Sequence, residues 1–176
     1  MGHAEEFKTF HHGKVLISYT TIQLSLSPPR RTFDRRHSGL LELRISCREL
    51  ALHLSSLAQV FSSSPLISTL EELELREANY RESSLWEFGI KNAQWLELLR
   101  PCAALKNLYL THGVAQGVCG ALRELSGEMA TEVLPALRNL FVQGFESLQP
   151  IQEAMMPLVS ARQLSGHPLV VDHWIV

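Results

Sequence analysis

Leucines and other apolar residues recur along this chain at two spacings, one typical of strands and one typical of helices. The spacing L-x-x-L-x-L, with a β-branched residue allowed at the last position, occurs four times and starts at residues 40, 70, 105 and 137. The second half of each copy alternates apolar and polar residues, which predicts a short strand because strand side chains point alternately to two faces. The four sets are Leu40, Leu43 and Ile45; Leu70, Leu73 and Leu75; Leu105, Leu108 and Leu110; and Leu137, Leu140 and Val142.

Between these strands, apolar residues three and four positions apart predict amphipathic helices. The helical ranges are residues 47–62, 92–100, 114–126 and 150–164. Pro101 ends the second helix, and Pro150 suits a first helical turn. Pro157 is expected to bend or interrupt the last helix. Two further strands are expected at residues 15–27 and 169–176, which flank the repeats.

A strand–helix unit repeated every 30 to 35 residues is typical of a repeat protein, because one unit cannot bury its apolar face alone. The predicted fold is therefore α/β, a short irregular leucine-rich repeat solenoid of parallel strands alternating with helices. We expect residues 1–14 to be a disordered N-terminal stretch and residues 15–176 to form a single leucine-rich repeat-like domain.

Stacked parallel strands would turn the repeated leucines inward and the residues between them to an open face. The central column of that face is expected to be Arg44, Glu74, Tyr109 and Phe141. Two aromatic side chains beside charged and amide groups are typical of protein interfaces. Alternatively, a terminal segment or a loop covers Tyr109 and Phe141. The candidate protein-binding residues are Arg44, Glu74, Arg76, Asn107, Tyr109, Asn139, Phe141 and Gln143.

Composition and charge exclude several classes of partner. The chain has 176 residues, 45% hydrophobic and 19% charged, with a formal net charge of -2. This balance gives no electrostatic footprint for nucleic acid, and the basic segment at residues 28–36 is interpreted as a solvated loop. No apolar run approaches the roughly 18–20 residues that span a bilayer. The three cysteines indicate buried reduced thiols, so we expect an intracellular protein, cytoplasmic or nuclear.

The chain carries no recognised catalytic motif. It has no Gly-x-Ser-x-Gly elbow, phosphate-binding loop or dinucleotide fingerprint. His11 and His12 are expected to be solvated, and the nearby His167, Asp172 and His173 lack the further ligands of a zinc site. We therefore expect no enzymatic activity, no cofactor and no bound metal.

The second half of the chain contains an ordered series of motifs that is more specific than the leucine spacing alone. The motifs are residues 92–101 (NAQWLELLRP), 104–110 (ALKNLYL), 121–125 (ALREL), 131–142 (TEVLPALRNLFV) and 161–168 (ARQLSGHP), preceded by residues 45–49 and 54–60. This series resembles the leucine-rich C-terminal region of the large mushroom family of F-box and F-box-like proteins. The resemblance extends over residues 15–174.

The resemblance implies an adaptor in which an F-box docks the linker subunit of a cullin ubiquitin ligase while the repeats hold a substrate. A Leu-Pro-x-Glu-type helix pair, with which an F-box opens, does not occur before Val15. We therefore expect a protein-interaction module with an unidentified protein partner, and the missing F-box argues against docking of the ligase linker. The alternative is a degenerate or truncated family fragment with no independent function.

Overall fold

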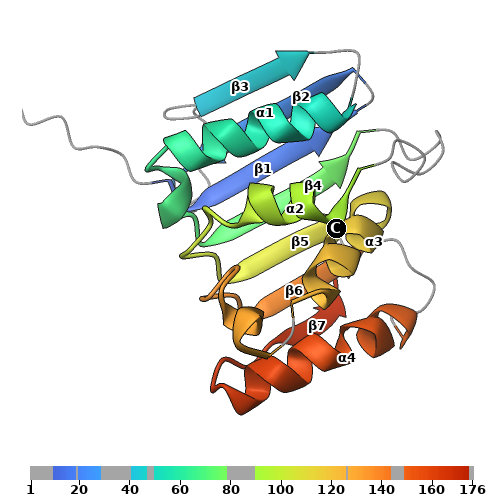
Figure 1. Cartoon of the computed structure of the whole chain (residues 1–176). Helices are drawn as coiled ribbons and strands as arrows, with labels where there is room; N and C mark the ends of the chain where they lie inside the picture. Colours follow the sequence, from blue (N-terminus) through green and yellow to red (C-terminus); the bar gives the residue numbers. More distant parts are fainter. Residues whose placement is uncertain are drawn as a thin grey trace, which may run out of the picture.

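The computed structural model describes residues 10–18, 20–28, 41–46, 50–78, 90–125, 127–143 and 149–174. In this part of the chain, seven strands form one sheet and four α-helices pack on it (Figure 1). The strands are β1 (His12–Ile17), β2 (Thr21–Ser27), β3 (Leu41–Ser46), β4 (Glu72–Glu77), β5 (Asn107–Thr111), β6 (Asn139–Gln143) and β7 (Val170–His173). The helices are α1 (Leu50–Ser63), α2 (Asn92–Leu99), α3 (His112–Arg123) and α4 (Gln149–Leu164), with short 3-10 turns η1 (Ile67–Thr69) and η3 (Gly127–Thr131).

The sheet combines an antiparallel part and a parallel part. Its strand order is β3-β2-β1-β4-β5-β6-β7. Strands β1, β2 and β3 pair antiparallel, whereas β4 to β7 follow β1 in parallel. The fold is therefore α/β with an open, mostly parallel sheet.

The register of the last three repeats confirms that their βα units lie side by side. Leu73 pairs with Leu108, and Leu108 pairs with Leu140. The first repeat differs, because its strand β3 pairs with β2 at the outer edge and is separated from β4 by two strands. The prediction that all four repeat strands stack in succession is wrong for this copy. The cause is that β1 pairs with β4 and β2 pairs with β1, so β3 can join the sheet only beyond β2.

All four α-helices lie on one side of the sheet, and no helix of the described residues covers the other side (Figure 1). The inward side chains of the strands are buried against these helices, with Leu73, Leu75, Leu108, Leu110 and Leu140 fully buried. Alternate residues of the same strands are mostly half-buried on the opposite face. The layers thus follow from the period-2 pattern of the strands.

Differences from the sequence prediction concern β1, β2 and α4 above all. Residues 15–27 form two strands because a turn at Ser18 and Thr21 divides them; the Thr21 amide donates to Ser18 Oγ at 3.1 Å. Residues 12–14 belong to β1, so the predicted disordered stretch 1–14 is wrong there; residues 1–9 lie outside the described part. Helix α4 continues through Pro157, which lies on the exposed side of the helix.

A buried arginine ties together the segments that precede β6 and β7. Arg162 on α4 is 1% exposed and donates to five backbone carbonyls. Its guanidinium lies 3.0 Å from Ala130 O and 3.0 Å from Leu137 O, and it also contacts His167 O at 3.3 Å. Burial lowers the pKa of Arg162 because the charged form loses hydration. The carbonyl dipoles compensate that loss and fix both segments relative to α4.

Candidate functional site

The helix-free face of the sheet carries three rows of side chains that run across the strands. The register places His12, Glu72, Asn107, Asn139 and Val170 in the first row, at the amino ends of the parallel strands. The second row contains Lys14, Glu74, Tyr109, Phe141 and Asp172. Arg76 continues the face on β4, and Thr111 and Gln143 continue it on β5 and β6.

Three aromatic side chains form a cluster on this face. Tyr109 and Phe141 stack with ring centroids 4.8 Å apart and planes 14° apart. Trp174, which follows β7, meets Tyr109 edge-on at 5.2 Å. The Arg76 guanidinium lies 4.7 Å from the centre of the Trp174 ring, in cation–π geometry. We call Arg76, Tyr109, Phe141 and Trp174 the aromatic cluster.

The cluster is half-buried rather than fully open or fully covered. Tyr109, Phe141 and Trp174 each retain intermediate exposure. The C-terminal segment therefore covers part of Tyr109 through Trp174, as the alternative of a covering terminal segment anticipated. Part of each of these three side chains therefore remains exposed.

A buried carboxylate anchors the arginine of the cluster. Glu74 on β4 forms an ion pair with Arg76, and its side chain is only 8% exposed. His12 on the neighbouring strand β1 lies 4.0 Å from the other carboxylate oxygen of Glu74. A charge removed from water is stable only with close partners, so Glu74 holds Arg76 against the Trp174 ring.

A polar ladder runs along the first row beside the aromatic cluster. Asn139 donates through its amide to Asn107 Oδ1 at 2.8 Å, and Asn107 donates to Glu72 Oε1 at 3.3 Å. Equivalent side chains on parallel neighbouring strands stand one above another, which allows this chain of contacts. The ladder presents amide and carboxylate groups along one edge of the face.

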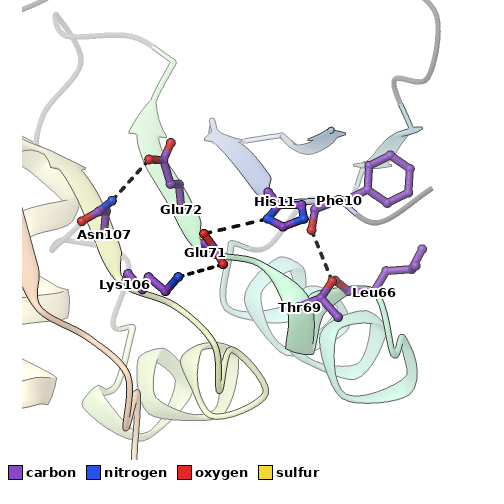
Figure 2. A network of polar contacts seen from close by, with 8 residues as sticks. All are labelled: Phe10, His11, Leu66, Thr69, Glu71, Glu72, Lys106 and Asn107. Carbon is purple, nitrogen blue, oxygen red and sulfur yellow. Dashed lines mark hydrogen bonds and ion pairs between the residues drawn. The ribbon is translucent and has the colours of Figure 1, made fainter. Parts of the chain in front are cut away.

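A second polar network borders the ladder at the amino ends of β1, β4 and β5 (Figure 2). Glu71 accepts a hydrogen bond from Lys106 Nζ at 2.8 Å and lies 3.9 Å from His11 Nδ1. The hydrogen bond from Lys106 holds the pKa of Glu71 below its ordinary value. Thr69 Oγ1 donates to Phe10 O at 3.2 Å, which ties the start of the described chain to η1.

The structure brings together all the predicted protein-binding residues except Arg44. Glu74, Tyr109 and Phe141 are direct neighbours across β4, β5 and β6, and Arg76, Asn107, Asn139 and Gln143 surround them. Arg44 lies on β3 and pairs in register with Gln23, with their side chains 3.3 Å apart. The predicted column from Arg44 to Glu74 is therefore wrong, because β2 and β1 separate them and the register offsets their rows.

Two residues of this surface, Trp174 and His12, were not predicted from the sequence. Trp174 joins the cluster because β7 lies parallel to β6 with Phe141 opposite Asp172. His12 was expected to be solvated, yet its side chain is 15% exposed and faces Glu74. The sequence predicted a terminal strand near Trp174, but it did not give the register of that strand relative to β6. Nothing in the sequence around His12 indicated that its side chain would lie beside Glu74.

The described residues also bear on metal binding, thiol reactivity and membrane spanning. No group of three or more His, Cys, Asp and Glu side chains there could hold a metal ion. Burial raises the pKa of Cys102 and of Cys119 to about 12, so both thiols stay protonated and weakly nucleophilic. Cys47 and the basic residues 30–36 lie outside the described part. No helix in the described ranges is long and apolar enough to cross a membrane.

Comparisons with protein-family models, curated proteins and solved structures found no match to this chain. The resemblance to F-box-like proteins therefore stays a prediction from sequence motifs.

Proposed function

We propose that the chain is a protein-interaction module that binds a protein partner on the open face of its sheet, centred on Tyr109 and Phe141. The observation that carries the proposal is the aromatic cluster on the sheet face that no helix of the described residues covers. Its rings supply rigid contact area, and Arg76 adds a fixed cation at one side. Tyrosine, tryptophan and arginine are the side chains that most often dominate binding energy at protein interfaces.

The polar ladder suggests what the partner presents to this surface. Glu72, Asn107 and Asn139 offer amide and carboxylate groups next to the rings. We propose a partner segment that places apolar side chains on the aromatic cluster and donates backbone hydrogen bonds to the ladder. Such a segment would combine an apolar centre with a polar rim, the usual anatomy of a specific interface.

The repeat character of the chain also belongs to this proposal. The in-register βα units from β4 to β6 support a leucine-rich repeat-like arrangement, in which residues between the leucines contact ligands. By its resemblance, the module corresponds to the substrate-holding repeats of F-box adaptors. We propose a non-catalytic, intracellular role on the same basis.

Site-directed photo-crosslinking tests the proposed surface. A photoreactive amino acid at Phe141 should capture a partner in cells of the source organism, whereas the same group at Met156 should not. Met156 is the matched control because it is apolar, 54% exposed and on the outer side of α4. The captured protein would then be purified and its affinity for the unmodified chain measured.

The paired substitutions Tyr109→Ala and Phe141→Ala are expected to weaken that affinity about tenfold or more. Met156→Ala should leave it unchanged. Thermal melts of each variant would show whether the fold persists, and Tyr109→Leu with Phe141→Leu would preserve apolar volume if the alanines unfold the protein. Equal affinity of wild type and the paired variants would refute this binding surface.

A fragment without independent function remains the second candidate. It is favoured by apolar side chains exposed on the outer strands, with Leu41 on β3 47% exposed and Val170 on β7 55% exposed. Exposed edge strands invite pairing between chains. A soluble monomer in sedimentation experiments would argue against this candidate, and concentration-dependent aggregation would favour it.

A further inference from the structure

A hollow of about 730 Å³ lies at the amino ends of β5, β6 and β7, apart from the aromatic cluster. Its polar lining consists mainly of Lys106, Arg138, Asn139 and His167, and Pro135 and Pro168 contribute apolar walls. The lining therefore combines basic side chains with apolar surface and contains no Asp or Glu.

Two of the basic residues, Lys106 and Arg138, occupy equivalent positions directly before the neighbouring strands β5 and β6. The amides of Arg138 and Asn139 both donate to Lys106 O, at 2.9 Å and 3.0 Å. Adjacent strands lie about 4.8 Å apart, so the two cationic side chains start close together, which is unfavourable without a compensating anion. Lys106 is partly compensated by Glu71. No ion pair joins Arg138 to another residue in the described ranges.

The walls of the hollow are held in place before any ligand arrives. Arg162 bonds to the carbonyls of Pro135, Leu137 and His167, all of which line it. Gly166, also in the lining, adopts a φ of 78° that favours glycine and fixes the turn before His167. A preorganised site loses little conformational entropy on binding.

We propose that this hollow binds a small organic anion, a carboxylate or phosphate group carried on an apolar body. Arg138 and Lys106 contact the charged group, with His167 beside them, and the apolar body rests between Pro135 and Pro168. The guanidinium of Arg138 suits both anions because its planar donors match two oxygen atoms at once. Charge and shape at this hollow, rather than any catalytic group, define the ligand class.

Titration of the full chain with phenyl phosphate and with benzoate, followed by NMR, tests the proposal. The expected result is saturable shifts of the amide signals of Arg138, Asn139, Gly166 and His167. Benzamide has the same body as benzoate without its charge, and inorganic phosphate has the charge without the body. Both are expected to bind more weakly than the aromatic anions.

Matched variants separate specific binding from general attraction. Arg138→Gln should weaken binding of the preferred anion about fivefold, the effect of one partly exposed ion pair. Arg123→Gln removes an arginine that is likewise exposed, in the last turn of α3, and should leave binding unchanged. Glu71→Gln removes the carboxylate that competes for Lys106 and should tighten binding.

Three results would overturn the proposal. They are the absence of saturable shifts with both aromatic anions, benzamide binding as tightly as benzoate, and equal losses in Arg138→Gln and Arg123→Gln. Preference for phenyl phosphate or for benzoate would assign the ligand as a phosphate or a carboxylate. Tyr109, Phe141 and Trp174 do not line the hollow, so anion binding there does not depend on the rings of the aromatic cluster, although Asn139 belongs both to the lining and to the polar ladder.

Discussion

The single side chain of Arg162 binds backbone carbonyls of several separate segments. Its five carbonyl partners belong to η3, to the segment that leads into β6 and to the turn before β7. Leu134, one of these partners, has a φ of 57°, a conformation that costs a bulky residue about 1–3 kcal/mol. Its fully buried side chain and the bond from Arg162 hold it there. Arg162 therefore acts as a structural clamp, because its hydrogen bonds hold these segments together.

Replacing Arg162 by methionine is expected to destabilise the protein by about 3 kcal/mol. Methionine fills much of the same volume but leaves buried carbonyl groups without donors. Urea unfolding followed by circular dichroism would measure the change. Arg123→Met, at an exposed position on α3, should change the free energy of unfolding by less than about 0.5 kcal/mol. Similar stabilities of the two variants would contradict the clamp.

At the scale of elements, periodicity was a reliable guide to helices and strands but a poor guide to their order. The strands of the last three repeats pair in the register that their leucines predict. The turn between β1 and β2 was missed, although inward residues change from odd positions, such as Val15 and Ile17, to even positions, such as Ile22 and Leu24. That change of parity requires a break in a single strand. The turn lacks the glycine or asparagine that usually marks one.

The repeat leucines should carry the stability of the parallel part. Leu108→Ala removes a fully buried side chain between Leu73 and Leu140 and is expected to cost about 2–5 kcal/mol. Leu164→Ala is the matched control because Leu164 is 90% exposed at the end of α4. Chemical denaturation of both variants would measure the difference. A small cost at Leu108 would mean that the sheet does not form the core of the fold.

For the whole molecule, the antiparallel hairpins explain why the candidate surface differs from the predicted one. Local patterns indicate that a strand exists, whereas its neighbour depends on packing among distant segments. Strands β1 and β2 therefore came between β3 and β4, which removed Arg44 from the predicted column and brought His12 beside Glu74. The same dependence on long-range packing brought Trp174 to Tyr109. The central residues were predictable because their strands repeat one pattern.

The two buried thiols offer a test of whether this sheet and its helices unfold as one unit. Cys102 is fully buried and Cys119 is 6% exposed, and burial raises the pKa of each to about 12. At pH 8 roughly one such thiol in ten thousand is ionised, so a disulfide reagent should label them only after the structure opens.

In a Cys47→Ser background, the two thiols should therefore be labelled at one common rate, equal to the rate expected from the free energy of unfolding. Single Cys102→Ser and Cys119→Ser variants would assign the two signals by mass spectrometry. A shared rate that rises with urea in parallel with global unfolding would establish a single cooperative domain. Faster labelling of Cys119 would instead place a local opening at α3, because Cys119 lies on that helix.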